Sequence, residues 1–275
     1  MKKEPFKDKV IIVTGGASGI GRALCTALAQ RQPKVVVVAD LNMEQAETVV
    51  QELWQGGANA EAVAVDVADE AAVRLLIDGT VEKYGRLDFM FNNAGIAISG
   101  EAQDMELSHW QKMLDVSLWG VIYGTRLAYE VMLQQGSGHI INTSSASGIT
   151  PVPMGLPYAT AKHGVVGLST ALRMEAADKG VRVSVVCPGV IRTPIFDTSE
   201  EVTPIDRGKW LDSPMYRMME PEDCARVILK GVAKNKGIIT VTAETKMMWW
   251  IYRVSPRFMD VMGRMIARKY REMSV

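Results

Sequence analysis

Cysteine and histidine are scarce in this sequence. The chain of 275 residues holds only three of each. The cysteines are Cys25, Cys187 and Cys224, and the histidines are His109, His139 and His163. The odd number of cysteines and the absence of a CxxC spacing argue against a disulfide framework and indicate reduced thiols in a cytoplasmic protein. The histidines lie too far apart for the usual ligand spacing, so we expect no metal site.

A net charge and a long apolar run are also absent. The 31 basic and 31 acidic residues cancel, and this balance argues against a nucleic-acid partner, because binding to a polyanion depends on an excess of positive charge. No uninterrupted stretch of about eighteen apolar residues exists, so no membrane span is predicted. Residues 1–9 carry several charges and lack the apolar core of a signal peptide. These absences predict a soluble, cytoplasmic chain.

Short apolar runs rich in β-branched residues recur along the chain. They lie at 10–13, 35–39, 62–65, 87–91, 139–143 and 181–186, and 238–242 could add a final strand. Segments with helical periodicity alternate with them, at 19–31, 43–55, 70–84, 108–134, 158–179 and 222–233. Apolar strands that alternate with helices predict an α/β fold, a doubly wound parallel sheet in a Rossmann-type three-layer sandwich.

A glycine-rich loop follows the first predicted strand and opens the first predicted helix. Residues 14–21 read TGGASGIG. Glycines without Cβ atoms let the backbone turn sharply and approach a pyrophosphate, whose charge then faces the positive end of the helix. The candidate cofactor-binding residues in this loop are Gly15, Ser18, Gly19, Ile20 and Gly21.

Asp40 ends the second apolar run, about 20 residues after the loop, where an acid accepts hydrogen bonds from the ribose hydroxyls of a dinucleotide. A 2′-phosphate at this position would be repelled by the carboxylate. Neither Leu41, Asn42 nor Ser18 supplies a compensating cation. The sequence therefore favours NAD over NADP.

Tyr158 and Lys162 stand four residues apart in a predicted helix and so share one face. A nearby ammonium group stabilises a phenolate, so we expect Lys162 to lower the pKa of Tyr158 and make it an acid/base group. Ser145 follows the strand predicted at 139–143, and its hydroxyl is placed to hydrogen-bond a substrate oxygen. We expect the adjacent Ser144 to serve packing instead.

With these motifs in order, residues 8–243 resemble the short-chain dehydrogenase/reductase family. The resemblance includes the glycine loop, Asp66 after the third strand, the NNAG motif at 92–95, Ser145, Tyr158, Lys162 and the Pro188-Gly189 turn. It implies that Asp66 and Val67 border the adenine and that Asn92, Asn93 and Gly95 support the cofactor cleft. It also implies that the carboxamide side of the nicotinamide is held by Pro188, Gly189, Ile191 and Thr193.

One position departs from the family pattern. The family places an asparagine, which bends the helix and seats a water that relays protons, where this chain reads Val116-Ser117-Leu118. We expect Ser117 to bend the helix by bonding to the carbonyl four residues earlier, and the relay to need a second water because serine is shorter.

The end of the chain is unusual in composition. Methionine and tryptophan concentrate at Met215, Met218, Met219, Met247, Met248, Trp249 and Trp250. They are either ordinary core or an adaptable apolar wall over a substrate. Residues 246–275 hold seven basic and two acidic residues in a helical pattern, which favours packing on the subunit or a neighbour over contact with acidic lipid.

The resemblance and the motifs together predict an enzyme. We expect a single Rossmann-type catalytic domain at 1–245, with a substrate loop at about 190–220, and a basic amphipathic extension at 246–275. The expected reaction interconverts a secondary alcohol and a ketone with NAD, on a bulky apolar substrate. Tyr158 moves the hydroxyl proton, Ser145 fixes the oxygen, and Lys162 also holds the nicotinamide ribose. The alternative is a catalytically weak NAD-binding regulator or scaffold. The resemblance further implies a homodimer or homotetramer that pairs through 108–134 and 158–179.

Overall fold

A seven-stranded parallel sheet forms the centre of the computed structural model, which describes residues 4–204 and 218–273. The strand order is β3-β2-β1-β4-β6-β7-β9, and a separate pair is formed by β5 and β8. The strands are β1 (Val10–Thr14), β2 (Val35–Asp40), β3 (Ala60–Ala64), β4 (Phe89–Asn92), β5 (Ile98–Ser99), β6 (Gly138–Thr143), β7 (Val181–Cys187), β8 (Glu200–Glu201) and β9 (Ile238–Thr240). The helices are α1 (Gly19–Ala29), α2 (Met43–Gln55), α3 (Glu70–Tyr84), α4 (Leu107–Leu114), α5 (Gly120–Gln135), α6 (Leu156–Glu175), α7 (Ile195–Thr198), α9 (Pro221–Ala233), α10 (Ala243–Val254) and α11 (Pro256–Met273).

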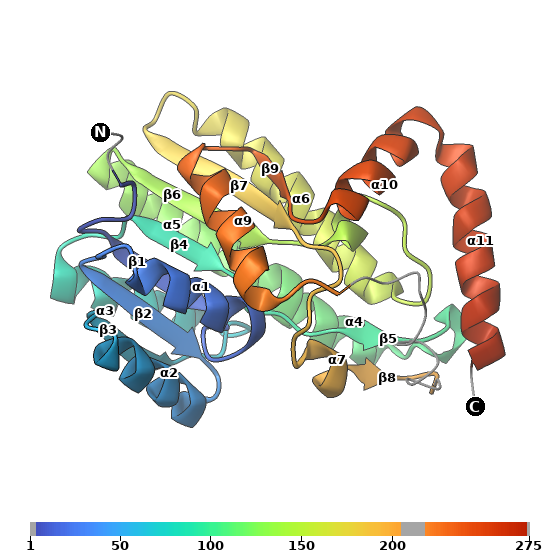
Figure 1. The fold of residues 1–275 in the computed structure, drawn as a ribbon, viewed down its shortest axis with the longest axis horizontal. Helices are drawn as coiled ribbons and strands as arrows, with labels where there is room; N and C mark the ends of the chain where they lie inside the picture. Colours follow the sequence, from blue (N-terminus) through green and yellow to red (C-terminus); the bar gives the residue numbers. More distant parts are fainter. Residues whose placement is uncertain (1–3, 205–217, 274–275) are drawn as a thin grey trace.

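The helices cover the sheet on both faces (Figure 1). Alternate side chains of each strand point to opposite faces, so Ile11 and Val13 pack with α1, α2 and α9, whereas Val10 and Ile12 pack with α3 and α5. Nearly every residue of β1 and β2 is buried, because both faces are covered. The predicted doubly wound, three-layer fold is confirmed.

The helix predicted at 108–134 is interrupted. Between α4 and α5 the chain forms a π turn, Asp115–Trp119, with Ser117 buried inside it. The helix predicted at 158–179 begins earlier, at Leu156, because Pro157 suits a first turn, where its missing N–H costs nothing. The sequence pattern did not predict the two-residue strands β5 and β8, which pair Ile98 with Glu200.

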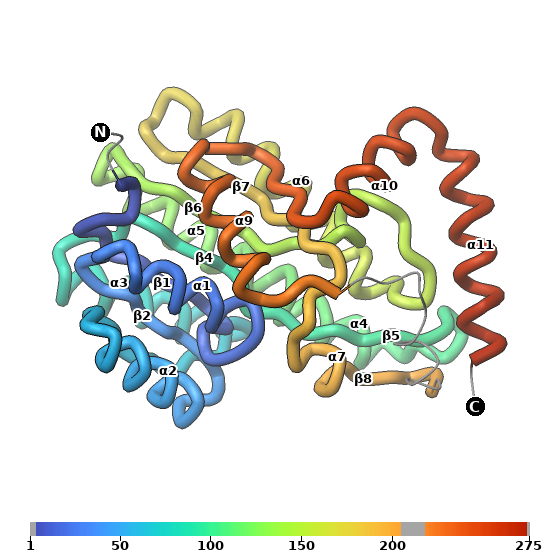
Figure 2. The backbone as a smooth tube through the Cα atoms, in the orientation of Figure 1, coloured from blue at the N-terminus to red at the C-terminus, as the bar shows by residue number. Residues whose placement is uncertain are grey.

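The end of the chain forms two consecutive helices, α10 and α11, here called the tail hairpin. Figure 2 shows α11 running along one side of the molecule, apart from the helices that cover the sheet. Tyr270 fixes its far end, donating a hydrogen bond to the Thr203 carbonyl at 3.3 Å, and Arg271 pairs with Glu101 at 3.0 Å. The boundary predicted at residue 245 falls within α10, and the division into domain and extension stays a prediction. In the part of the chain that the structure describes, no helix combines the length and apolarity needed to cross a membrane.

Candidate active site

The glycine loop between β1 and α1 is shaped by close backbone approaches. Gly15 and Gly19 have left-handed φ values of 63° and 49°. A Cβ on Gly15 would lie 2.8 Å from the Cα of Ala94, and one on Gly21 would collide with the Gly15 carbonyl oxygen. Only glycine fits these positions. Helix α1 begins at Gly19 with no side-chain cap from Ser18, so its positive end faces the loop and fits a pyrophosphate. Ile20 packs against the core.

Thr14 and Asn93 tie the carboxyl ends of β1 and β4 together. The Thr14 hydroxyl accepts hydrogen bonds from the backbone N–H groups of Asn93 at 3.0 Å and Ala94 at 3.1 Å. The Asn93 side chain donates to the Thr14 carbonyl at 3.1 Å. These bonds hold the glycine loop against the end of β4, the neighbouring strand in the sheet. Sequence reasoning missed Thr14, although its place between strand and glycines was a usable signal.

Asp40 lies at the end of β2, beside the glycine loop. One carboxylate oxygen accepts from the Ala17 N–H at 3.0 Å and the other from the Asn42 N–H at 3.0 Å. Because a carboxylate can accept about four hydrogen bonds, both oxygens retain capacity for ribose hydroxyls. After β3, Asp66 is exposed and accepts from the Ala68 N–H at 2.9 Å. The adjoining Val67 is buried.

Asn92 supports this edge of the sheet from inside. Its side chain donates to Asn142 at 2.8 Å and to Thr125 at 3.3 Å, and Asn142 donates to Ser169 at 3.0 Å. All four residues are buried. The polar groups of the Asn92 side chain are therefore used within the core.

Tyr158, Lys162 and Ser145 come together at the carboxyl ends of β6 and β7. The Ser145 hydroxyl lies close enough to Tyr158 to lower the pKa of its phenol, and it accepts a hydrogen bond from the Ser147 N–H at 3.2 Å. The Lys162 ammonium lies 5.6 Å from the centre of the Tyr158 ring and donates to the Thr143 carbonyl at 3.2 Å. Ser144 donates to the Lys162 carbonyl at 2.8 Å, which fastens α6 to β6.

Burial is the main cause of the pKa shifts of Tyr158 and Lys162. It lowers the pKa of Lys162 to about 8 and raises the pKa of Tyr158, and the nearby Ser145 hydroxyl opposes only part of the rise in Tyr158. The expected lowering of the Tyr158 pKa by Lys162 is therefore wrong for this state, because desolvation outweighs the neighbouring groups.

Ser117 does not bond back along its own helix as expected. Its hydroxyl accepts from the Ile96 N–H at 3.2 Å and donates to the Ile96 carbonyl at 3.4 Å. The π turn brings the short side chain to that strand-end loop. A Cβ on Gly95 would lie 3.4 Å from the Ser117 hydroxyl and 3.3 Å from the Lys162 ammonium. Ser117, Gly95 and Lys162 are thus neighbours.

The segment from Pro188 to Thr193 connects the two halves of the site. The Pro188 carbonyl accepts from the Ala146 N–H at 2.7 Å, beside Ser145. A Cβ on Gly189 would lie 2.7 Å from the Thr242 hydroxyl, and one on Gly19 would lie 3.1 Å from the Thr193 side chain. Ile191 is buried. Sequence reasoning missed Thr242, whose approach to Gly189 depends on the tertiary fold.

Apolar side chains surround Tyr158. Ile98, Met113 and Ala161 are buried here. Half-buried neighbours complete this cluster: Ile96, Met105, Leu114, Leu118, Tyr158 itself and Val202. The candidate acid/base group therefore lies in an apolar environment.

The methionine- and tryptophan-rich set is divided by the structure. Met219 packs against the main core, and Trp249 packs against the buried cluster that contains Val165. Met247 and Trp250 are exposed on α10. Met215 and the rest of residues 205–217 of the predicted substrate loop fall outside the described residues.

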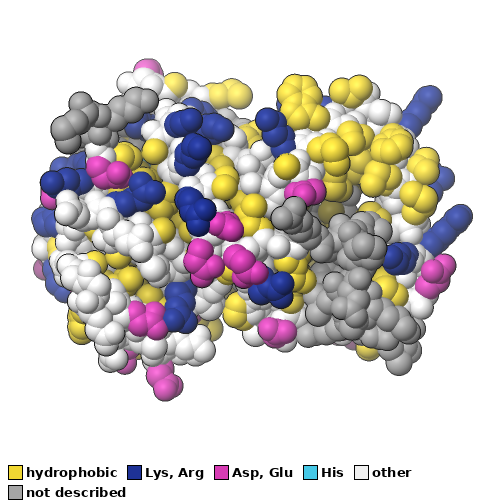
Figure 3. All heavy atoms as spheres, viewed as in Figure 1, with side chains coloured by type: hydrophobic (Ala, Val, Ile, Leu, Met, Phe, Trp, Pro, Cys, Tyr) yellow, Lys and Arg dark blue, Asp and Glu magenta, His cyan; other side chains and the backbone are white. Residues whose placement is uncertain are grey.

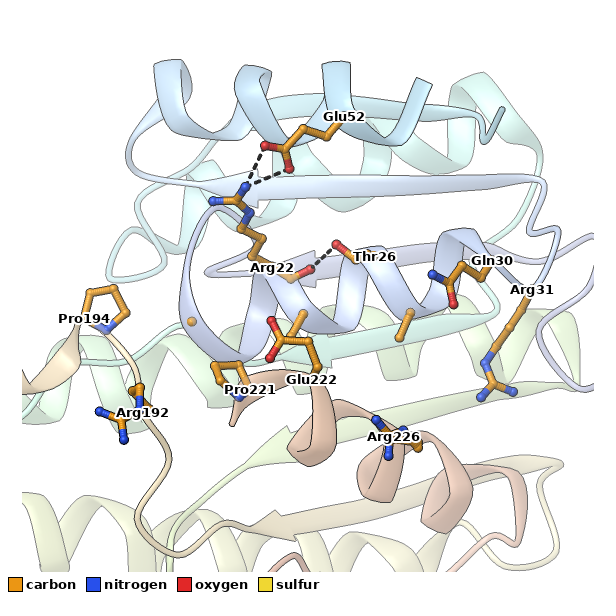
Figure 4. Close-up of a pocket in the computed structure, with 13 residues that line it drawn as sticks. Arg22, Thr26, Gln30, Arg31, Glu52, Arg192, Pro194, Pro221, Glu222 and Arg226 are labelled. Atoms are coloured by element: carbon orange, nitrogen blue, oxygen red, sulfur yellow. Dashed lines mark hydrogen bonds and ion pairs between the residues drawn. The ribbon is translucent and has the colours of Figure 1, made fainter. Parts of the chain in front are cut away.

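An open groove of about 920 Å³ lies along the outer side of α1 (Figure 4). Gly19 and Pro194 are among the residues that line it. Its arginines are paired: Arg22 reaches Glu52 at 2.6 Å, and Arg226 reaches Asp223 at 2.8 Å. None of the three groups proposed for proton transfer lines it.

Comparison with known proteins agrees with this arrangement. Residues 9–203 match the family model described as short chain dehydrogenase. The chain is 34% identical to cyclohexanol dehydrogenase of Acinetobacter sp. (strain SE19), over 86% of this chain and 92% of that protein. It is 36% identical to levodione reductase of Leifsonia aquatica over the same shares. A protein of Mycobacterium tuberculosis (strain ATCC 25618 / H37Rv) named SadH is 31% identical over 98% of this chain and 94% of its own length.

Solved structures give the same result. A short-chain dehydrogenase/reductase from Burkholderia phymatum, in complex with NAD, superposes with a TM-score of 0.82 and 26% identity, over 90% of this chain and 94% of that one. The structure of levodione reductase gives 0.76 and 30%, over 86% and 96%. The chain therefore belongs to the short-chain dehydrogenase family and is an oxidoreductase that acts on CH–OH groups with a nicotinamide cofactor.

Proposed function

We propose that this oxidoreductase uses NAD in preference to NADP and interconverts bulky, apolar secondary alcohols with their ketones. The observation that carries the reaction assignment is the position of Tyr158 beside Ser145 and within an apolar cluster. The alternative of a catalytically weak regulator has no comparable support, because the groups needed for proton transfer are in place.

The cofactor preference rests on Asp40. The Ala17 N–H holds one of its carboxylate oxygens toward the glycine loop, where a 2′-phosphate would meet a negative charge at close range. The flanking residues Leu41 and Asn42 offer no positive charge. In this proposal the glycine loop holds the pyrophosphate, Asp40 holds the adenosine ribose, and Lys162 holds the nicotinamide ribose.

The proton transfer follows from the positions of the side chains. The bound nicotinamide supplies or accepts a hydride, and the protein handles the proton. Ser145 and Tyr158 hydrogen-bond the substrate oxygen. Because its pKa is raised, Tyr158 is protonated at neutral pH and donates its proton to the oxygen of a ketone. In alcohol oxidation Tyr158 takes the hydroxyl proton instead, and the Lys162 ammonium stabilises the phenolate that forms.

The substrate preference rests on the apolar cluster around Tyr158. Ile98 and Met113 are buried, and Leu118 is half-buried next to them. An apolar substituent that leaves water for such surroundings gains about 25 cal/mol per Å², or about 0.8 kcal/mol per CH₂. Small alcohols lack that area and should be poor substrates. The apolar cluster therefore fits steroid-like, terpenoid or long-chain secondary alcohols, all of which carry a large apolar surface.

One set of steady-state measurements tests both preferences. A homologous series of secondary alcohols would be assayed with NAD and with NADP. We expect kcat/KM to rise with chain length and to be at least about tenfold higher with NAD, a difference of roughly 1.4 kcal/mol. Asp40→Arg should narrow or reverse the ratio of kcat/KM with NAD to that with NADP, while Asp78→Arg, at an exposed position on α3, should leave this ratio unchanged. Equal use of both cofactors, or a flat chain-length series, would contradict the corresponding preference.

A further inference from the structure

The tail hairpin carries a concentrated group of exposed, large apolar side chains. They are Met247, Trp250, Val254, Phe258, Val261 and Met265, each between 51% and 79% exposed. Figure 3 shows hydrophobic side chains gathered over α10 and α11 at the upper right of that view. The other exposed, large apolar side chains among the described residues are scattered over the rest of the chain.

The apolar groups form a stripe on each helix. On α10 they occupy positions 247, 250 and 254, and on α11 positions 258, 261 and 265. A spacing of three and then four residues places side chains on one face of a helix. The opposite side of α11 faces the protein, because Met259 and Tyr270 are buried. The exposed stripes are therefore additional to the face that the core uses.

Positive charge accompanies these stripes. Residues 246–275 hold seven basic and two acidic residues, although the whole chain has a formal net charge of zero. Arg253, Arg257, Arg264 and Arg268 are all exposed on the two helices. The excess of positive charge is thus a local property of the tail hairpin.

In place of the packing that the sequence alone favoured, we propose that the exposed face of the tail hairpin docks on an anionic lipid surface, with α10 and α11 lying at the level of the headgroups. A helix with an apolar stripe and basic flanks is suited to this position, and arginines gain from anionic headgroups. A second copy of the same face fits less well, because it would bring two positively charged surfaces together. The hairpin lies on the membrane and does not cross it, since neither helix is apolar enough.

Docking in this way orients the enzyme. The end of α11 is attached beside β5 through the contacts of Tyr270 with Thr203 and of Arg271 with Glu101. Ile98 of β5 belongs to the apolar cluster around Tyr158. The lipid surface would therefore lie on the flank of the catalytic cluster. The proposal does not depend on the substrate being apolar, because it rests on the hairpin alone.

Vesicle flotation with the full-length protein tests the proposal. The vesicles would be pure phosphatidylcholine, or an equimolar mixture with phosphatidylglycerol. We expect partitioning at least about tenfold stronger to the anionic vesicles. Raising the salt from about 0.1 M to about 1 M shortens the Debye length from about 10 Å to about 3 Å and should weaken binding.

Two variants separate the apolar and the charged contributions. F258S/V261S/M265S and R264Q/R268Q should each lower partitioning to anionic vesicles at least about tenfold while retaining the wild-type circular dichroism spectrum. The matched controls are M43S/L75S, which removes exposed apolar groups from α2 and α3, and K230Q/K234Q, which removes two exposed charges from α9 and the residue after it. Both should bind like the wild type.

Two results would contradict the proposal that the tail hairpin docks on lipid. Flotation that is absent, or equal for the two kinds of vesicle, would overturn the proposal. So would a wild-type particle mass in solution that falls only in F258S/V261S/M265S, because the stripe would then be covered by a second copy of the chain.

Discussion

Tyr158 and Lys162 are both shifted toward their neutral forms, because burial penalises charge on each of them. At neutral pH Tyr158 is a neutral phenol and can donate its proton. It can act as a base only after it has lost that proton. Lys162, with a pKa of about 8, is mainly cationic below pH 8 and mainly neutral above it. The support that its charge gives to a phenolate is therefore available chiefly below that pH.

Replacing Tyr158 with phenylalanine tests the acid/base assignment. Tyr158→Phe should lose most turnover, because only the proton-transferring hydroxyl is removed, and general acid/base catalysis contributes roughly 10²–10⁴-fold. NAD binding, followed by the change in protein fluorescence on titration, should be retained. Tyr252→Phe on α10 is the matched control. Turnover near the wild-type value in Tyr158→Phe would show that another group moves the proton.

Replacing Lys162 with methionine tests the role of its charge. The loss in kcat/KM for alcohol oxidation, relative to the wild type, should be greatest below pH 8, where the ammonium is present, and should shrink as pH rises through the pKa of about 8. Steady-state rates measured across that range give the ratio directly. Lys179→Met, at an exposed position, should show no such dependence. A constant ratio for Lys162→Met would mean that the lysine acts only by packing and binding.

Among the secondary-structure elements near the candidate active site, the π turn between α4 and α5 is the main irregularity. The turn inserts one extra residue and carries Ser117 to the backbone of Ile96. The apolar pattern of 108–134 predicts helix on both sides but cannot register a local change of period. The partner of Ser117 lies 21 residues earlier in the chain, so the contact also depends on the tertiary fold.

Replacing Ser117 with alanine tests this bracing. Ser117→Ala removes the partner of two Ile96 backbone groups and should lower the free energy of unfolding by about 1–3 kcal/mol. Urea unfolding followed by circular dichroism measures the change. Thr48→Ala removes an exposed hydroxyl that bonds only within α2 and should change stability by less than about 0.5 kcal/mol. Equal effects of the two substitutions would rule out a bracing role.

Other elements show where sequence reasoning succeeds. Strands β1 and β2 are buried on both faces, and their apolar runs located them within one residue. Ser144 also matched its predicted packing role, because it bonds the backbone of α6. The inward direction of Asn92 was not predictable, since its partners Thr125 and Asn142 come from other elements. The short pair β5 and β8 joins segments about a hundred residues apart, which no local pattern reveals.

At the scale of the whole molecule, the strand order explains where the site lies. Successive strands run outward from β1 to β3 on one side and from β4 to β9 on the other. Between β1 and β4 the direction of winding reverses, and connections leave a crevice at such a switch point. Thr14 and Asn93 meet there. Asp40 stands on one side, and Tyr158 and Lys162 stand on the other.

We propose that the enzyme is a homodimer or homotetramer that pairs through α4, α5 and α6. Leu107 of α4, Trp119 of the π turn before α5 and Leu156 of α6 are large apolar side chains left exposed in the single chain. Light scattering at micromolar concentration should give at least twice the mass of 30.2 kDa. Trp119→Ser should weaken the assembly, because a buried aromatic anchor contributes strongly to an interface, whereas Leu75→Ser on α3 should not. A monomeric wild type would contradict this prediction.

The contact between Arg271 and Glu101 joins positions 170 residues apart. On a ribosome that adds about 5–20 residues per second, roughly ten to thirty seconds separate the synthesis of the two partners. Throughout that interval the glycine loop and Asp40 are already made, while the side of Glu101 that Arg271 later covers stays open to water. The first strands of the sheet can therefore begin to pair before the final helix is synthesised, and the contact between Arg271 and Glu101 is among the last to form.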